Sequence, residues 1–371
     1  MQGHTLVGVG ESPEVTMAEA LSLSKVFNTQ AGWYRGDFHA HTNYSDGEHT
    51  PDELVEVARA EGLDFIVVTD HNTISAFVKF GDQREVLVIP GMEVTFRDGH
   101  FNVFGVEGWS EWMEGFVHDR DIGERPGRAP SDILRQTSAL GLLNSLNHPL
   151  LEPWEWRDGA AEMGDVHCVE VWNDPSWPDN LEANPKALKL WTKWLNAGCR
   201  VTAIGGSDYH RPEPKPGEDK PPERLGLPST YVYAQQLSGA AILEGLRRHR
   251  AYISMGARAS LQAQTNGKSY EIGDDLGEWS GAIDFKATVT DCRSSGRAQI
   301  VSNGHVVAEA PIEGGQAVLR WRTNTDPARS DWVRLDVFGG EGQMLAITNP
   351  IYAGTQPTPA MQKFGDFVSL R

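Results

Sequence analysis

The sequence has little cysteine, and this scarcity argues against two kinds of protein. Its 371 residues include only Cys168, Cys199 and Cys292, which lie far apart and form no CxxC pair. A secreted disulfide scaffold or a thiolate zinc site is therefore not expected. Three separate thiols in the reduced state are what we expect of a cytoplasmic protein.

Long apolar runs are also absent from the sequence. No stretch of 18 or more apolar residues occurs, and the first 30 residues lack a basic segment followed by an apolar one. We therefore expect neither a membrane anchor nor a secretory signal.

Positive charge is in short supply, with 33 Lys and Arg against 51 Asp and Glu and a net charge of −18. The resulting field repels phosphate backbones and anionic lipids, which argues against nucleic-acid and membrane partners. A small anionic substrate is still compatible with this charge, because bound metal ions can invert the charge inside a site.

A serine-nucleophile signature is missing as well, because no GxSxG sequence occurs. The composition is that of a globular protein, with 39% hydrophobic and 23% charged residues. The length of 371 residues exceeds that of one ordinary domain. We therefore expect one large catalytic unit with a smaller companion.

Residues 31–255 alternate short apolar runs with amphipathic stretches, whereas residues 1–30 are interpreted as an N-terminal extension with a helix-like stretch at Met17–Val26. A helix is expected at Pro51–Glu61, with Thr50 as its N-cap and Gly62 after its end. Further helices are expected at Ser131–Ala139 and Pro185–Ala197. Strands are expected at Gly36–His41, Asp64–Thr69, Val86–Ile89, His100–Gly105, Leu142–Asn147, Val166–Trp172 and Val201–Gly205.

This rhythm favours an α/β barrel over residues 31–255, in which functional residues collect at the carboxyl ends of the strands. Residues 211–228 contain six prolines and predict a long exposed loop of the kind that often serves as a functional lid. Residues 256–371 show short alternating runs separated by turn residues, which predict a small β-sandwich. Its expected strands are Ala282–Val289, Ala298–Ser302, His305–Ala308, Ala317–Arg322 and Trp332–Val337.

Six histidines stand with carboxylates in short blocks that lie at the ends of apolar runs. His39 and His41 are two residues apart, so on a strand they point to the same side and can bind one ion. Each block alone has an ordinary explanation, such as a turn, a buried hydrogen-bonded pair or a helix cap. Together the blocks predict a metal site. The expected ligands are His39, His41, Asp46, His71, Glu93, His100, His148, Asp208 and His210.

This ligand set also indicates a type of chemistry. Imidazole and carboxylate ligands without thiolates suit zinc, manganese or iron. Nine ligands exceed the need of one ion, so we expect two or three divalent ions about 3.5–4 Å apart. Such ions lower the pKa of a bridging water towards neutrality, which makes metal-bound hydroxide the expected nucleophile. Their excess positive charge favours an anionic group such as a phosphate ester.

In their order and spacing the blocks resemble the polymerase and histidinol phosphatase (PHP) family of metallohydrolases, over about residues 35–255. The resemblance implies a distorted (β/α)7 barrel for residues 31–255, ahead of the β-sandwich. The matching pieces are His39-Ala40-His41-Thr42 with Ser45-Asp46-Gly47, Thr69-Asp70-His71-Asn72, Gly91-Met92-Glu93 with His100, Asn147-His148-Pro149, and Gly206-Ser207-Asp208-Tyr209-His210.

The resemblance also implies how the ligands divide among the ions and which of them take part in catalysis. Glu93 would bridge two ions, and Glu93, Asp208 and His210 become the catalytic candidates beside the hydroxide. Tyr44-Ser45-Asp46-Gly47 and the β-rich tail resemble the carbaryl-hydrolase branch, in which esters or carbamates are cleaved. The implied sites are His39, His41, Glu93 and Asp208 for one ion, Glu93, His100 and His148 for a second, and Asp46, His71 and His210 for a third.

Substrate-binding candidates are fewer. Glu170 and Asn173 end an expected strand and are candidates for contact with the substrate or with the metal ligands. Arg211 and Arg224 flank the site in the proline-rich loop and are candidates for bidentate phosphate binding, with a solvated surface role as the alternative. Three tryptophans in segments after strands are candidates for the wall beside an aromatic substrate, namely Trp154, Trp156 and Trp177.

Three functions are compatible with this reading. The first is a phosphoesterase acting on small phosphomonoesters or diesters. The second is an arylester or carbamate hydrolase in the same fold, and the third is a non-catalytic metal- or sugar-binding module. An amidohydrolase-type barrel fits less well, because that pattern normally lacks the Ser207-Asp208-Tyr209-His210 ending. The oligomeric state is left open by the sequence, and an oligomer is compatible with it.

Overall fold

The computed structural model describes residues 21–80, 85–116, 127–218, 220–279, 281–325, 329–355 and 362–368. Residues 1–20 lie outside this part of the chain, and with them the first residues of the helix-like stretch expected at Met17–Val26. Residues 21–26 form no α-helix. Leu21 is fully buried and Asn28 forms an isolated bridge with Leu237, so residues 21–30 lie against the fold.

The first half of the described chain builds a mixed sheet, in which β1 pairs with β2 and β2 with β3 in parallel, as do β5 with β6 and β6 with β7. β4 is antiparallel to both β3 and β5, and β8 is antiparallel to β1 and β9. The fold is therefore mixed α/β with a parallel-strand sheet. The strands are β1 (Gly32–Asp37), β2 (Phe65–Val68), β3 (Leu87–Phe96), β4 (Gly99–Phe104), β5 (Leu143–Leu146), β6 (Cys168–Asn173), β7 (Thr202–Gly206), β8 (Ser229–Ala234) and β9 (Ala251–Ser254).

The two ends of this sheet meet through isolated contacts. A single parallel bridge joins Ala40, beyond β1, to Tyr209, beyond β7. Further along β7, the side chain of Thr230 in β8 bonds both backbone groups of Gly205, and the side chain of Asn349 bonds both backbone groups of Ala203. Among the described residues no backbone ladder runs from β7 to β8, so a closed barrel is not shown.

Four α-helices accompany these strands in the described part of the chain: α1 (Pro51–Ala60), α2 (Pro130–Ala139), α3 (Asn180–Asn196) and α4 (Gly239–Arg247). The expected cap of α1 is confirmed, because Thr50 and Glu53 form a reciprocal capping box. α3 begins five residues earlier than predicted and contains Pro185. Pro185 has no N–H to donate to the backbone carbonyl of Leu181. Because Leu181 is 74% exposed, water can bond this carbonyl instead. None of the described helices is both long and apolar enough to cross a membrane.

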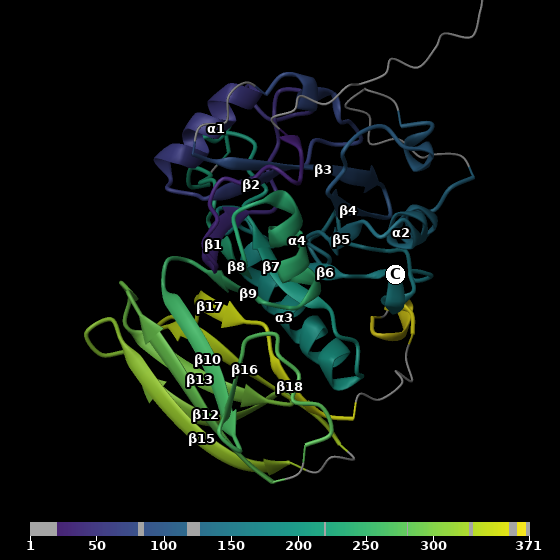
Figure 1. The fold of residues 1–371 in the computed structure, drawn as a ribbon. Helices are drawn as coiled ribbons and strands as arrows, with labels where there is room; N and C mark the ends of the chain where they lie inside the picture. Colours follow the sequence, from purple (N-terminus) through teal and green to yellow (C-terminus); the bar gives the residue numbers. More distant parts are fainter. Residues whose placement is uncertain are drawn as a thin grey trace, which may run out of the picture.

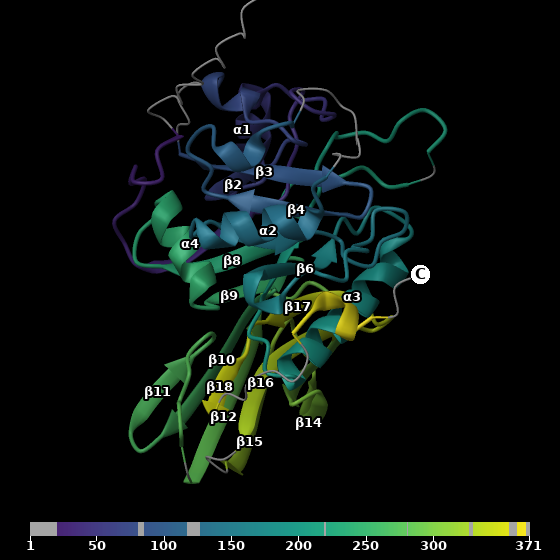
Figure 2. The same ribbon diagram turned by 90° about the vertical axis from the view of Figure 1, so that its right-hand side faces the viewer.

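Among the described residues beyond β9, the only regular elements are strands and a short 3-10 turn at Phe364–Asp366. One sheet has the order β11-β10-β12-β15, and β14, β13, β16, β17 and β18 continue the large sheet through the pairing of β17 with β9. Figures 1 and 2 show these strands on the side of the molecule away from β2 and β3. They are β10 (Arg258–Thr265), β11 (Lys268–Glu271), β12 (Gly281–Thr290), β13 (Gly296–Ser302), β14 (His305–Pro311), β15 (Ala317–Thr325), β16 (Ser330–Gly339), β17 (Met344–Thr348) and β18 (Ile351–Gly354).

The two sheets of this strand-rich part share one hydrophobic cluster. Leu261, Phe285 and Leu319 come from one sheet, and Ile300 and Leu335 come from the other. All five expected strands are present, whereas β10, β11, β17 and β18 were not predicted. Because β17 pairs with β9, the large sheet crosses the boundary that the sequence suggested near residue 256.

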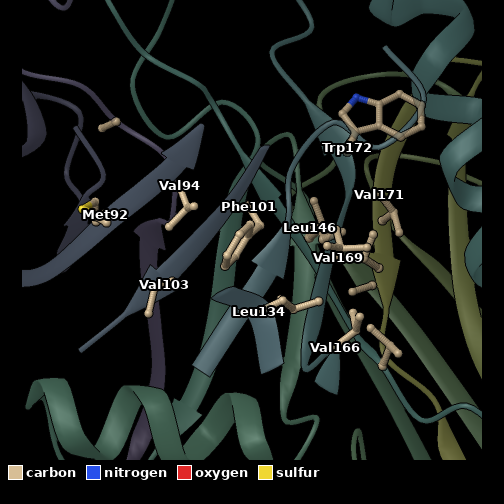
Figure 3. Close-up of a cluster of buried hydrophobic side chains, with 14 of the residues drawn as sticks. Met92, Val94, Phe101, Val103, Leu134, Leu146, Val166, Val169, Val171 and Trp172 are labelled. Carbon is tan, nitrogen blue, oxygen red and sulfur yellow. The ribbon is translucent and has the colours of Figure 1, made fainter. Parts of the chain in front are cut away.

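A second cluster packs behind the sheet of the first half, and Figure 3 shows part of it. Met92 and Val94 of β3 point into this cluster with Phe101 of β4. Because side chains alternate along a strand, Glu93 and Thr95 point to the opposite side. The packing of β3 therefore fixes the direction of the Glu93 carboxylate.

His249 follows α4, and its Nδ1 lies 2.7 Å from the Thr202 hydroxyl. The Thr202 hydroxyl donates its hydrogen to the Leu246 carbonyl at 2.9 Å. It therefore accepts the second hydrogen bond from the N–H at His249 Nδ1. Burial first, and the charge of Arg200 second, lower the pKa of His249 to about 4. The folded protein therefore holds His249 in its neutral form.

We expect this histidine to make the protein less stable in acid. An unfolded chain protonates histidine below about pH 6.5, whereas folded His249 takes up its proton near pH 4. The stability contributed by neutral His249 is therefore lost as pH falls through this window. Between pH 7.5 and 5, the free energy of unfolding should fall by about 2 kcal/mol more in the wild type than in His249→Asn. Asparagine tolerates the positive φ of 56° at this position. Urea unfolding at both pH values measures the difference, and equal losses in the two proteins would contradict it.

Candidate metal centre

The carboxyl ends of the parallel strands bring the predicted ligands to one place. His39 and His41 follow β1, His71 follows β2, and His148 follows β5. Glu93 lies inside β3, just after Pro90, where the pairing with β2 ends and the pairing with β4 begins. β4 is antiparallel, so its first residues reach the same end of the sheet and contribute His100. Asp208 and His210 follow β7.

Glu93 is the centre of the cluster, and its side chain is fully buried. Its Oε2 lies 3.3 Å from His39 Nε2, 3.4 Å from His41 Nε2 and 2.9 Å from His71 Nδ1. Its Oε1 lies 3.2 Å from His100 Nδ1 and 3.6 Å from His148 Nε2. One carboxylate therefore contacts imidazoles from four different strand ends.

Two aspartates complete the cluster. Asp208 Oδ1 lies 3.1 Å from His39 Nε2 and 3.2 Å from His41 Nε2, on the same nitrogens that face Glu93. Asp46 Oδ1 lies 3.3 Å from His210 Nε2 and 3.5 Å from His71 Nε2. The structure thus brings all nine predicted ligands together.

These distances are close to those of a metal site. Ligand atoms that each stand about 2.0–2.2 Å from a tetrahedral ion are about 3.3–3.6 Å apart. The distances of Glu93 from His39 and His41, 3.3 and 3.4 Å, match this spacing, and those of Asp208, 3.1 and 3.2 Å, are slightly shorter. Moreover, His39 Nε2, Glu93 Oε2 and both ring nitrogens of His100 are buried and have no hydrogen-bond partner. Such groups are costly to bury unless something else satisfies them, and a divalent ion would do so.

Three sets of ligand atoms lie close enough together to hold an ion. They involve buried and half-buried side chains, and they overlap at His41, His71 and Glu93. The two oxygens of the Glu93 carboxylate could serve two adjacent ions, whereas a neutral histidine offers one lone pair and would serve only one ion. The sets are His39, His41 and Glu93; His71, Glu93 and His100; and His41, Asp46, His71 and His210.

The electrostatics of the cluster favour charged carboxylates. Burial would raise the pKa values of Glu93 and Asp208, but the neighbouring histidines hold both well below the usual range. Burial lowers the pKa of His41 to about 4, with His210 and His71 adding to the effect. Although burial opposes it, the neighbouring carboxylates raise the pKa values of His39, His71 and His210. A metal ion bound by these histidines would displace their protons, because only the neutral imidazole is a ligand.

Further buried groups hold the ligands in position. Glu170 Oε1 lies 2.8 Å from His39 Nδ1, and its Oε2 accepts hydrogen bonds from the backbone N–H of His148 and from Asn173 Nδ2. Asn147 Nδ2 donates to Glu93 Oε1 at 2.8 Å. Glu170 is fully buried, so it orients a ligand in the manner of the carboxylates that support metal-bound histidines.

Two aspartates with structural roles were missed in the sequence. Asp37 accepts hydrogen bonds from the backbone N–H groups of His39, Ser207 and Gly226, and so ties the end of β1 to the end of β7. Asp70 accepts from Thr42 and Ser45, and so fixes the turn before Asp46. Asp70 stands within one of the matching pieces and Asp37 lies two residues before another, so their position at strand ends was the available signal.

A cavity of about 280 Å³ opens beside the cluster. Arg211 and Asn173 line it, whereas Arg224 lies outside its lining and forms an ion pair with Glu61 at 2.8 Å. The expectation that Arg224 flanks the site is therefore not met. Trp154 and Trp177 line the cavity, but Trp156 is buried against Phe101 and Phe364 in the core. The other residues that line the cavity, outside the ligand cluster, are Leu151, Asp174, Asn180, Lys215, Glu218, Lys220 and Glu223.

Comparison with known proteins agrees with the location of the cluster. Residues 37–149 match the family model of the PHP domain, a range that contains His39 to His148 but not Asp208 or His210. An uncharacterized protein of Methanocaldococcus jannaschii is 25% identical over 153 residues, which cover 38% of this chain and 81% of that protein. The resemblance to the carbaryl-hydrolase branch is not confirmed by these comparisons.

Two solved structures are similar to the chain as a whole or in part. A two-domain protein from Bacteroides vulgatus, described as containing a predicted PHP-like metal-dependent phosphoesterase, has a TM-score of 0.48 and 16% identity and covers 92% of this chain and 100% of its own. A proposed metal-dependent phosphoesterase from Bifidobacterium adolescentis has a TM-score of 0.38 and 17% identity and covers 51% of this chain and 92% of its own.

The role of Glu170 can be tested by a substitution that keeps its shape. Glu170→Gln removes the charge beside His39 Nδ1, so we expect the affinity for zinc or manganese to fall about 10- to 100-fold. Titration against a fluorescent chelator measures this affinity. Glu162→Gln serves as the control, because Glu162 precedes β6 and faces Lys363 at 3.5 Å. Equal metal affinity in Glu170→Gln and the wild type would refute the positioning role.

Proposed function

We propose that the chain is a metal-dependent hydrolase that cleaves small phosphomonoesters or diesters. The observation that supports this most is the meeting of six imidazoles with the carboxylates of Glu93, Asp46 and Asp208, in which several ligand atoms are buried and unpartnered. Two or three divalent ions, of zinc, manganese or iron, are proposed to bind there. When bound, such ions activate water at neutral pH and stabilise the charge of a displacement reaction.

The proposed division of ligands is the one that the resemblance to the PHP family implies. His39, His41 and Asp208 share the first site with Glu93, and His100 and His148 share the second site with it. Asp46, His71 and His210 are proposed to form a third site, in which Asp46 Oδ1 faces Nε2 of His71 and Nε2 of His210. Glu170 and Asp37 hold the first site in shape from behind.

Arg211 supports an anionic substrate. It lines the cavity, is 7% exposed, and its Nε has no hydrogen-bond partner. The nearest carboxylate oxygens, of Glu48 and Glu218, lie 3.7 and 3.9 Å away, beyond hydrogen-bonding distance. A guanidinium whose Nε has no hydrogen-bond partner, beside the proposed metal ions, suits a phosphoryl group, which arginine can bind through two parallel hydrogen bonds.

An arylester or carbamate hydrolase is the second candidate. It is favoured by the aromatic wall of Trp154 and Trp177 and by the shortage of uncompensated cations in the lining of the cavity. The same metal centre would serve both reactions, so the two candidates differ in the group that is cleaved and not in the ligands.

The remaining parts of the proposal concern the whole chain. The net charge of −18 supports a small-molecule substrate and not nucleic acid or a membrane surface. We also propose that residues 31–255 form a distorted barrel. Residues 256–371 are proposed to form a β-sandwich accessory domain, because the two sheets of this strand-rich part share one hydrophobic cluster.

Metal analysis combined with hydrolysis assays tests this proposal. The purified protein is analysed for zinc, manganese and iron and then assayed on p-nitrophenyl phosphate, bis-p-nitrophenyl phosphate and p-nitrophenyl acetate, with and without added manganese. We expect two or three ions per chain, and kcat/KM higher on a phosphate ester than on the acetate. His39→Ala and Asp208→Ala should lose at least about 100-fold in kcat/KM together with bound metal, because each removes a ligand.

His305→Ala provides the matched control, because His305 is exposed on β14, far from the cluster in the sequence, and should leave metal content and rate unchanged. Preferential cleavage of the acetate would favour the second candidate. Full activity in His39→Ala, or less than one ion per chain after reconstitution with no turnover, would contradict a metal-dependent hydrolase and favour a binding module.

A further inference from the structure

The cavity beside the metal centre has two halves of different character. One half consists of the proposed ligands. The other half is built by segments after β5 and β6 and by the proline-rich loop, and it has no histidine or metal ligand among its described residues. Since the ligand half would take the group that is cleaved, the second half is where the rest of the substrate must lie. This step rests on the proposed function.

The wall of the second half is aromatic. Trp154 and Trp177 meet edge to face, with ring centroids 5.7 Å apart and planes inclined by 69°. Leu151, which is 3% exposed, lines the cavity beside them. Two perpendicular indoles and a leucine form an apolar corner that suits the flat face and the edge of a ring.

Trp177 is tied to the metal centre by a chain of contacts. Lys220 Nζ lies 5.0 Å from the centroid of the Trp177 ring and 2.7 Å from Glu223 Oε1. The other oxygen of Glu223 accepts hydrogen bonds from the backbone N–H groups of His210 and Arg211, at 2.7 and 2.9 Å. The distance between the aromatic wall and the ligand His210 is therefore fixed before a substrate arrives.

The charges in the second half balance. Arg211, Lys215 and Lys220 provide three positive charges, and Asp174, Glu218 and Glu223 provide three carboxyl groups. Lys220 is already paired with Glu223, and Arg211 is the cation closest in sequence to the ligands. The second half thus carries no excess of positive charge to attract a second anionic group on the substrate, and an uncharged group suits it better.

We propose that the second half of the cavity binds an uncharged planar ring, so that the substrate is an ester of an aromatic or similarly flat alcohol. Trp154 and Trp177 are the specificity-determining residues, and Lys220 positions Trp177. The volume of about 280 Å³ for the whole cavity limits the ring system to a small one.

A pair of substrates that differ only in planarity tests the proposal. Benzyl phosphate and cyclohexylmethyl phosphate both release a primary alcohol of similar acidity, so chemistry alone gives them similar rates. We expect the manganese-loaded wild type to favour benzyl phosphate about three- to tenfold in kcat/KM, the range of a single aromatic contact. Trp177→Leu and Trp154→Leu should each reduce this preference towards one while metal content stays unchanged. Trp109→Leu is the control, because Trp109 is 52% exposed and lies outside the lining of the cavity.

The same comparison is made for binding, with benzylphosphonate and cyclohexylmethylphosphonate titrated in a calorimeter. If neither phosphate ester is cleaved but the benzyl compound still binds several-fold more tightly in a Trp177-dependent manner, the ring site stands and phosphoester hydrolysis fails. If both esters are cleaved without preference and both phosphonates bind equally, the ring site is refuted and the hydrolase stands. A preference that survives both tryptophan substitutions also overturns the proposal.

Discussion

The contacts between the buried carboxylate of Glu93 and the surrounding imidazoles are the interaction on which the rest of the structure depends. An ionised carboxylate without access to water is very costly unless cations or hydrogen-bond donors surround it. Here imidazoles from four strand ends and the amide of Asn147 approach its two oxygens. The sheet has to bring β1, β2, β4 and β5 to one point for this to happen. The change from parallel to antiparallel pairing within β3 places Glu93 at that point.

Support for this carboxylate extends outward in layers of buried polar groups. Glu170 orients His39 and the backbone of His148, and Asp37 joins the end of β1 to the loop that carries Asp208. Behind them, Met92, Val94 and Phe101 pack in the apolar cluster that fixes β3 and β4. Beyond β9 the same sheet continues into the strand-rich part through β17, so the two parts are joined by backbone hydrogen bonds.

Most of the metal centre could be predicted from the sequence, because strand-end blocks are local signals. β1 ends at Asp37, before the end of the strand predicted at Gly36–His41, but His39 and His41 still face the same oxygen of Glu93. The cap of α1 is indicated by Thr50 and Glu53. Glu170 was among the predicted candidates for contact with the ligands, but the partners of Glu170 and Arg224 could not be predicted, because they lie far away in the chain. Glu170 meets His39 across 131 positions, and nothing near Arg224 in the sequence indicates its pairing with Glu61. β8, α4 and β9 were missed because their apolar patterns are short and carry no chemical motif.

Anomalous X-ray diffraction from crystals grown with manganese tests the central claim most directly. We expect strong anomalous peaks within bonding distance of Glu93, with at least one also in contact with His39 and Asp208 and another in contact with His100. The peaks should be absent from crystals of Glu93→Gln. Manganese bound elsewhere in the molecule, with no peak at Glu93 in the wild type, would contradict the account.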